Sequence, residues 1–323
     1  DQLISALDER GQPFAAFIVD HGLGPLWHEV TGREEFYRSR MQAEALFVAQ
    51  ERALRAIDQG LSAAEIDHVV IKGTANRLLL YANPAIRACY DFDVLVRPAD
   101  RVPAAKILVD EGFAAHPRRR NISRDLELTR ADAEIDLHWV LLREGRLRTD
   151  PTESMLGNRR RTQDMWMLSP EDAVFVLLVH PAFAKHLEGY EMGLHRVADL
   201  LQWLCGIQFD WSRVRARLDD NGVRTAAWAT LRWLDMLAGS SSPRFLPDLL
   251  ADLEPGRARR EWIDYWLRNN LSDRMSNARW GRLLGFSLFL HDTLGDAVRA
   301  GAGRCQANRR RQSDLAEFQG LSG

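Results

Sequence analysis

The stretch Asp91-Phe92-Asp93-Val94-Leu95-Val96 is the strongest clue to the fold, because it sets two acidic residues in an apolar run. Such a run is typical of a buried strand, where charges occur only with compensation. Strand alternation puts Asp91 and Asp93 on one face, with Cβ atoms roughly 6–7 Å apart. There, two carboxylates repel by about 2–3 kcal/mol at an effective dielectric of about 20. A divalent cation would reverse that repulsion, and hard cations prefer carboxylate oxygen.

A short β-branched segment precedes this pair. Residues 68–71 (HVVI) predict a strand that ends at Lys72-Gly73-Thr74, and residues 75–81 predict a helix that stops before Asn83-Pro84. A strand, a glycine, a hydroxyl residue and a helix start together can hold phosphate, because Gly73 allows close approach and free N–H groups lie at the helix start. The P-loop pattern is absent, and a lone glycine after a strand is usually only a turn.

A third segment, residues 134–140 (EIDLHWV), alternates charged and apolar residues. Period-two alternation predicts a strand with Glu134, Asp136 and His138 on one face and the apolar residues on the other. Residues 126–129 alternate as well, and residues 131–133 are suited to the turn of a hairpin. A carboxylate on this strand, placed beside Asp91 and Asp93, would complete a metal-binding triad.

The order of these motifs resembles the DNA polymerase β-type nucleotidyltransferase superfamily. In detail, "VVIKGTANRLLLYANPAIRACYDFDVLVRPAD", "EIDLHWVL", "LSPEDAVFVLLVHPAFAKH" and "HRVADLLQWL" are similar to an uncharacterised nucleotidyltransferase family of bacterial gene clusters. Members of that family occur beside genes for ribosomally made peptides, lasso peptides among them. The resemblance covers about residues 30–205.

The resemblance implies a role for individual residues. Asp91 and Asp93 would be paired ligands of Mg²⁺ or Mn²⁺, with Asp136 as the third, so that these three are the expected catalytic residues. Gly73 and Thr74 would hold the phosphates of a nucleoside triphosphate. Lys72 and Arg87 match family positions and are further nucleotide-binding candidates. The long spacing from glycine to aspartate and the Thr in place of Ser depart from the general superfamily pattern.

The implied activity is metal-dependent transfer of an NMP group from an NTP to an acceptor hydroxyl or phosphate, including tailoring of a ribosomally made peptide. In-line phosphoryl transfer requires positioning and charge neutralisation, which carboxylates and metal ions supply. Two alternatives stay open. One is a non-catalytic relative that binds a nucleotide or a partner protein, and the other is a toxin-like transferase that acts on tRNA or protein.

The carboxylates also have structural interpretations. Asp91 and Asp93 could be strand-end residues that face water, and Asp136 could be a solvated residue paired with Arg124 or Arg130. The rivals of Asp136 as third ligand are Glu127 and Glu134.

The histidines and cations have structural interpretations too. His138 suits a structural or ligand-supporting role, which Glu127 and Glu134 could share, because hard-cation sites prefer oxygen. His180, His186 and His195 lack metal-ligand spacing and are interpreted as ordinary helix residues. Lys72 and Arg87 could equally be surface cations.

Composition sets the remaining bounds. With 323 residues and 46% hydrophobic content the chain can bury a sizeable core. A net charge of -2 and a pI of about 6.6 favour a peptide, protein or small-molecule acceptor over nucleic acid. The three cysteines are unpatterned, and we see no signal peptide or membrane-spanning run, so we expect a cytoplasmic protein without a membrane partner. The chain opens at Asp1 without Met, which leaves room for an earlier segment.

We therefore expect an α+β protein with a polymerase β-type nucleotidyltransferase core, a small mixed sheet, between helical regions. The expected divisions are an N-terminal helical region at 1–62, the core at 63–165, a C-terminal helical region at 166–300 and a frayed tail at 301–323. Ser169-Pro170-Glu171-Asp172 predicts a helix start, since Ser caps and Pro suits the first turn.

Overall fold

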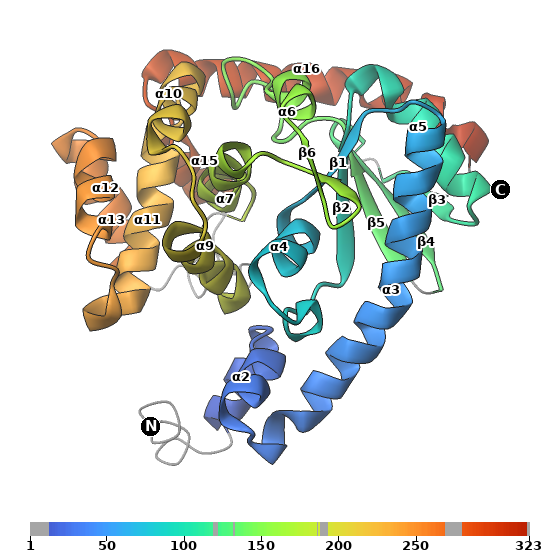
Figure 1. Ribbon diagram of the computed structural model, residues 1–323. Helices are drawn as coiled ribbons and strands as arrows, with labels where there is room; N and C mark the ends of the chain where they lie inside the picture. Colours follow the sequence, from blue (N-terminus) through green and yellow to red (C-terminus); the bar gives the residue numbers. More distant parts are fainter. Residues whose placement is uncertain are drawn as a thin grey trace.

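The computed structural model describes residues 13–118, 122–131, 133–185, 187, 193–268 and 280–321. In these residues helices surround a mixed sheet, so the α+β class is confirmed (Figure 1). The helices are α2 (Gly24–Thr31), α3 (Tyr37–Ala63), α4 (Lys72–Leu80), α5 (Arg101–Asp110), α6 (Thr152–Gly157), α7 (Pro170–Ala184), α9 (Leu194–Gly206), α10 (Trp211–Asn221), α11 (Arg224–Ala238), α12 (Leu246–Leu253), α13 (Arg257–Arg268), α15 (Trp280–Phe289) and α16 (Leu294–Phe318).

The sheet has seven strands in the order β3-β4-β5-β2-β1-β7-β6. Strand β2 runs antiparallel to β1 and parallel to β5, and β4 and β5 form the expected hairpin. Asp132, in the expected hairpin turn, lies outside the described residues. The strands are β1 (His68–Ile71), β2 (Asp91–Val96), β3 (Ala114–His116), β4 (Asp125–Arg130), β5 (Ala133–His138), β6 (Arg160–Thr162) and β7 (Met165–Met167).

One face of β2 and β5 is apolar and fully buried. It packs against α3 and α5, which lie on that side of the sheet. The strand side chains on this face are Phe92, Val94, Val96, Ile135 and Leu137, and none of them is exposed to solvent. The period-two alternation of the sequence therefore correctly predicts which side chains of these strands lie in the core.

The opposite face of the same strands meets the C-terminal helices. Leu95 joins a second apolar cluster that includes residues of α7, α9, α10 and α11. Helix α4 follows β1 directly and lies between β2 and α9 (Figure 1). The acidic residues of β2 and β5 lie on this same face, next to the apolar contacts that Leu95 makes with the C-terminal helices.

The C-terminal helical region begins as the sequence predicts. The Ser169 hydroxyl accepts a hydrogen bond from the Asp172 backbone N–H at 3.2 Å and caps α7, with Pro170 in the first turn. Although α7 is strongly apolar, no helix in the described ranges is long and apolar enough to cross a bilayer.

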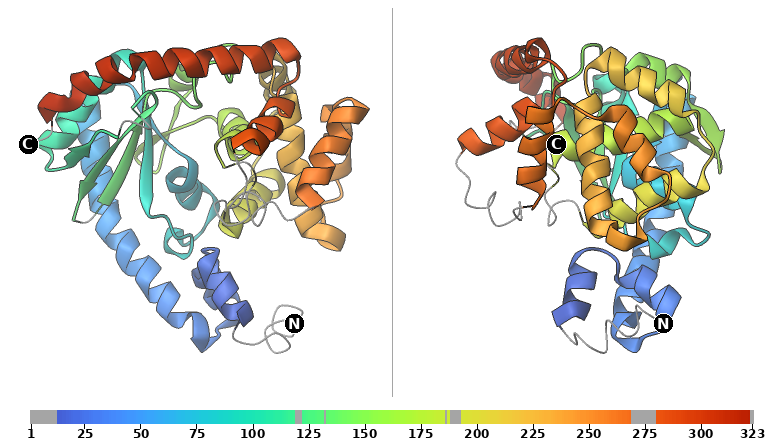
Figure 2. Two further views of the ribbon diagram at one scale, coloured as in Figure 1. Left: turned by 180° about the vertical axis from the view of Figure 1, so that it is seen from behind. Right: turned by 90° about the vertical axis from the view of Figure 1, so that its left-hand side faces the viewer.

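The expected frayed tail at 301–323 is wrong for residues 301–318, which belong to the 25-residue helix α16. Helix α16 runs along the molecule from the C-terminal helices to the far side of the sheet (Figure 2). The reason is a distant apolar contact: Phe318 is fully buried and stacks on Trp139, with ring centroids 5.6 Å apart. Ion pairs from Arg310 to Glu144 and from Arg101 to Glu317 add to this contact.

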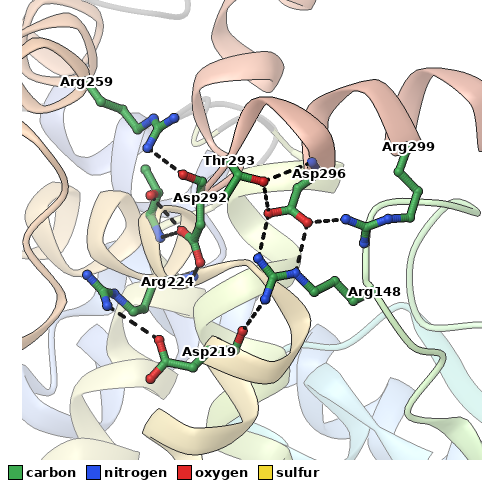
Figure 3. Close-up of polar contacts among 9 residues, drawn as sticks. Arg148, Asp219, Arg224, Arg259, Asp292, Thr293, Asp296 and Arg299 are labelled. Carbon is green, nitrogen blue, oxygen red and sulfur yellow. Dashed lines mark hydrogen bonds and ion pairs between the residues drawn. The ribbon is translucent and has the colours of Figure 1, made fainter.

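The start of α16 is held by a polar cluster (Figure 3). Arg148 donates two hydrogen bonds of 2.9 Å to the Asp296 carboxylate, and Arg299 pairs with the same carboxylate. Thr293 caps the helix through the Asp296 N–H at 3.1 Å. The cluster therefore fixes α16 to the loop that follows β5.

Candidate functional site

The register of β2 and β5 brings the predicted acidic residues together. Asp91 lies opposite Glu134, and Asp93 lies opposite Asp136. Leu95 lies opposite His138 in the same parallel ladder. Since side chains alternate along each strand, the acidic residues and His138 project from the same face.

This face forms one wall of a cavity of about 500 Å³. The acidic wall includes Asp91, Asp93 and Asp136, and α4 adds residues at its start. The opposite wall comes from α7, α9 and α11, and it mixes apolar, aromatic and basic side chains, among them Val176, Leu177, His180, Arg196, Trp233 and Leu234. The cavity thus joins a charged wall to a partly apolar one.

Asp93 is buried and has two close partners. Its Oδ1 accepts a hydrogen bond from Lys72 Nζ at 2.5 Å and lies 2.7 Å from His138 Nε2. Burial alone would raise the pKa of Asp93, but the Lys72 ammonium and the His138 ring hold it well below its usual value. Asp93 is therefore an anion that the protein keeps charged in a buried place.

Asp136 is in the opposite electrostatic situation. Burial, together with the carboxylates of Asp93 and Asp125, raises the pKa of Asp136 to about 7, and Lys72 offsets only part of this effect. Arg124, an expected partner of Asp136, instead pairs with Asp125 at 3.0 Å. A second negative charge is thus unfavourable here until a cation compensates it.

The donor atoms suit a metal ion. One ligand atom each from Asp93, Asp136 and His138 lie within 4.8 Å of one another. Two carboxylates and an imidazole are ligands for divalent cations, so the residues fit the metal that the family resemblance implies. Within the described residues, Asp91 is not part of this group, although it lines the same cavity two residues before Asp93.

The two rival glutamates differ in position. Glu134 lines the cavity, and burial followed by the charges of Glu127 and Asp91 raises its pKa. Glu127 does not line the cavity, and its carboxylate accepts a hydrogen bond from Arg118 at 2.5 Å. Neither is within the compact donor group of Asp93 and Asp136.

Only part of the expected phosphate-binding segment lies at the cavity. Lys72 and Gly73 line the cavity at the start of α4. Thr74 is fully buried outside the cavity lining, and its hydroxyl donates a hydrogen bond to the Asp91 carbonyl at 3.2 Å. A Cβ on Gly73 would lie 3.2 Å from the Arg87 guanidinium and from Cys89 Sγ. A larger side chain at residue 73 would therefore displace Arg87 or Cys89.

Arg87 lines the cavity but is bound to another element. Its Nη2 donates to Asp199 Oδ2 of α9 at 2.6 Å, and its Nε lies 3.2 Å from both oxygens. Asn76 and Tyr81 donate to the same carboxylate at 3.0 and 2.9 Å. Although burial alone would lower the pKa of Arg87, Asp199 raises it above the ordinary value. This network fastens α4 and the segment before β2 to α9.

Several further residues line the cavity although the sequence gives no reason to place them there. Asp125 and Arg124 at the start of β4 line the cavity, as does His180 of α7, whose pKa is lowered mainly by burial and then by Lys72. His195 also lines it and hydrogen-bonds the His21 carbonyl at 3.1 Å. His186 lies outside the described residues. The sequence around His180 and His195 shows no metal-ligand spacing, so only the packing of α7 and α9 brings these two residues to the cavity.

Comparison with known families agrees with the resemblance that the sequence motifs indicate. A sequence model of the family described as "Uncharacterised nucleotidyltransferase" matches residues 22–239, about two thirds of the chain. The chain belongs to this nucleotidyltransferase family. The matched region contains the whole sheet and the three helices, α7, α9 and α11, that face it across the cavity.

Other comparisons add little. No curated protein matches the chain. One similar solved structure is described as "tRNA-processing enzyme (apo form I)", with 11% identity, a TM-score of 0.23, and coverage of 84% of this chain and 93% of that one. Another, "Structure of tRNA-processing enzyme complex 3", has 11% identity, a TM-score of 0.21, and coverage of 79% and 89%. At these TM-scores the backbones differ too much for the likeness to bear on fold or function.

Proposed function

We propose that this nucleotidyltransferase is metal-dependent and moves an NMP group from an NTP to an acceptor hydroxyl or phosphate. The observation that carries the proposal is the parallel register of β2 and β5, which sets Asp93 beside Asp136 on the wall of a cavity. Two ionised carboxylates side by side on this face repel each other, and a divalent cation between them would remove that repulsion.

Each acidic residue has a role in this proposal. Asp93 and Asp136 would hold Mg²⁺ or Mn²⁺, and Asp91, on the same face, would be the ligand available for a second ion. Bound divalent ions would neutralise the charge that develops on the attacking and leaving oxygens. Asp136 is the group that would take the proton of the acceptor hydroxyl, because it lines the cavity beside the proposed ion.

The start of α4 is the proposed site for the NTP phosphates. Lys72 and Gly73 line the cavity there, and the first N–H groups of a helix attract anions. Thr74 supports this site from behind, through its hydrogen bond to the Asp91 carbonyl. Arg87 contributes positive charge at the wall while Asp199 fixes its position.

The acceptor is proposed to be a peptide, a protein or a small molecule rather than nucleic acid. The near-neutral charge of the chain gives no general attraction to a polyanion. The wall of Val176, Leu177, Trp233 and Leu234 offers apolar contact that a peptide side chain can fill. The need for NTP and the three unpaired cysteines favour action in the cytoplasm.

The ion pair between Lys72 and Asp93 supports a second candidate function, which is binding without catalysis. The Lys72 ammonium already neutralises Asp93, as a permanent ion pair would in a protein that binds a nucleotide or partner without catalysis. This candidate differs from the first in one respect: the ion pair would persist when Mg²⁺ and NTP are added.

The test is transfer of label from each of the four NTPs, carrying the label at the α-phosphate, to the protein itself, to peptides and to small hydroxyl compounds, with Mg²⁺ or Mn²⁺. We expect transfer that stops with a chelator and in Asp136→Asn. The control Asp110→Asn changes an exposed aspartate at the end of α5 and should transfer like the wild type. Binding of NTP without transfer to any acceptor would instead support the non-catalytic candidate.

A further inference from the structure

The geometry points to His138 as a metal ligand through Nε2. Asp125 orients the His138 ring, and the Lys72 ammonium occupies the position of the ion until the ion binds. We infer further that the site favours a cation that accepts nitrogen over Mg²⁺, and Mn²⁺ is the probe for the nitrogen ligand. This inference rests on the proposed metal-dependent function and assigns His138 a different role from the supporting one that its sequence position suggests.

The contacts of Lys72 carry the first step. Its Nζ lies 2.5 Å from Asp93 Oδ1 and 3.1 Å from His138 Nε2, and these two acceptors are themselves 2.7 Å apart. Nε2 cannot satisfy both neighbours. With a proton it donates to Asp93 but meets the ammonium, and without one it accepts from Lys72 but faces a carboxylate lone pair. Lone pairs of Asp93 Oδ1 and His138 Nε2 that both point at the Lys72 ammonium could equally point at a metal ion.

The surroundings of the other ring nitrogen carry the second step. Asp125 lies opposite His138 in the antiparallel ladder of β4 and β5, so both project from the same face. The distance from His138 Nδ1 to Asp125 Oδ2 is 3.8 Å, an ion-pair contact longer than a hydrogen bond. A carboxylate there favours the tautomer with the proton on Nδ1. That tautomer leaves the Nε2 lone pair for a metal, as a carboxylate behind a metal-binding histidine commonly does.

The donor set carries the third step. The ligand atoms of Asp93, Asp136 and His138 lie within 4.8 Å of one another, so one ion can contact all three after small movements. Mg²⁺ prefers oxygen ligands and retains its waters, whereas imidazole suits Fe, Ni, Cu and Zn, and Mn²⁺ accepts it less readily than these ions do. An ion at this point carries more charge than Lys72 and takes its place between Asp93 and His138. Lys72, which lines the cavity, is then released toward the nucleotide side.

The direct test is pulsed electron paramagnetic resonance on the full chain with one equivalent of Mn²⁺. We expect the modulation of a coordinated imidazole nitrogen, and we expect it to change when histidine is labelled with ¹⁵N. His138→Asn should lose the modulation. The control His116→Asn, on the exposed edge strand β3 of the same sheet, should keep it. Mn²⁺ that binds with oxygen ligands only, or fails to bind, would overturn the inference.

Calorimetric titration with Mn²⁺ and Mg²⁺ tests the two supporting residues. Asp125→Asn should weaken Mn²⁺ binding by about 10–100-fold, the usual effect of removing the group behind a metal-binding histidine. Lys72→Gln should tighten it, while Lys106→Gln, at an exposed position on α5, should leave it unchanged. Equal Mn²⁺ affinity in Lys72→Gln and wild type would contradict the competition between Lys72 and the ion.

The outcomes separate this inference from the proposed function. Oxygen-only Mn²⁺ binding together with NMP transfer would leave the proposed function standing and remove His138 as a ligand. Nitrogen coordination without transfer to any acceptor would keep the metal site and remove the proposed activity.

Discussion

The two faces of strands β2 and β5 have opposite character although they share one backbone. One face carries Phe92, Val94 and Ile135, which are fully buried against α3 and α5. The other carries Asp93, whose buried charge Lys72 and His138 compensate, and Asp136, whose charged form is unfavourable for the isolated chain because its pKa is raised. The comparison teaches that the first face supplies stability and that the second holds groups which stability alone does not explain.

The largest expected effect is on the acidic face. Asp93→Asn should lower nucleotidyl transfer by about 10³-fold or more, because electrostatic stabilisation of the transferring phosphoryl group would be lost. Thermal unfolding should change much less, since Lys72 is partly exposed and can turn toward the cavity. Label-transfer rates and circular dichroism melts measure the two effects. Transfer at the wild-type rate would show that this face is structural.

The next effect is on the apolar face. Phe92→Ala should cost about 3–5 kcal/mol of unfolding free energy, because it leaves a cavity under α3 and α5. Activity per folded molecule should stay close to that of the wild type. Urea unfolding measures the cost, and Val30→Ala, at a residue that is 65% exposed, is the control within about 0.5 kcal/mol. If Phe92→Ala abolished transfer in the folded fraction, the division between the faces would be wrong.

A smaller effect is expected at the edge of the acidic face. Gly73→Val should weaken NTP binding by about tenfold, or roughly 1.4 kcal/mol, because its Cβ meets the Arg87 guanidinium at 3.2 Å. Calorimetric titration with NTP and Mg²⁺ measures the change. Gly157→Val, where no atom lies within 4 Å of an added Cβ, is the control. Unchanged affinity in Gly73→Val would place the phosphates elsewhere.

The smallest effect concerns a carboxylate with a structural role. Hydrogen bonds from Arg148, Thr293 and Arg299 hold the pKa of Asp296 below its usual value against the effect of burial (Figure 3). A depressed carboxyl pKa stabilises the fold above the unfolded value, near 3.9, and this stability is lost as the pH falls below it.

Asp296→Asn should therefore cost about 1 kcal/mol at pH 7, because Arg148 is partly exposed, and should cost progressively less below pH 4. Urea unfolding from pH 7 down to pH 3 measures this difference. A cost that stayed constant over this range would mean that the carboxylate charge does not hold α16.

The comparison of the two faces also shows what the sequence could predict. Alternation along residues 91–96 and 134–140 predicts both strands and the sides on which their acidic residues lie, because strand geometry repeats every two residues. The capped start of α7 was predictable for a similar local reason.

The remaining features depend on distant contacts. Asp199, the partner of Arg87, lies 112 residues away, and nothing near Arg87 indicates it. The Lys72 contact with His138 requires the register of β1, β2 and β5 together. The sequence predicts a frayed tail over residues 301–318, whereas a helix forms there and is held by Phe318 against Trp139.

The central claim is that Asp93 and Asp136 together hold the metal ion of a nucleotidyl-transfer site. Crystals grown with Mn²⁺ and a non-hydrolysable NTP analogue test it through anomalous diffraction at the manganese edge. The account predicts an anomalous peak within about 2–2.3 Å of an oxygen of each carboxylate, with the α-phosphate beside it. A nucleotide bound with no peak between Asp93 and Asp136, or a peak away from both residues, would contradict it.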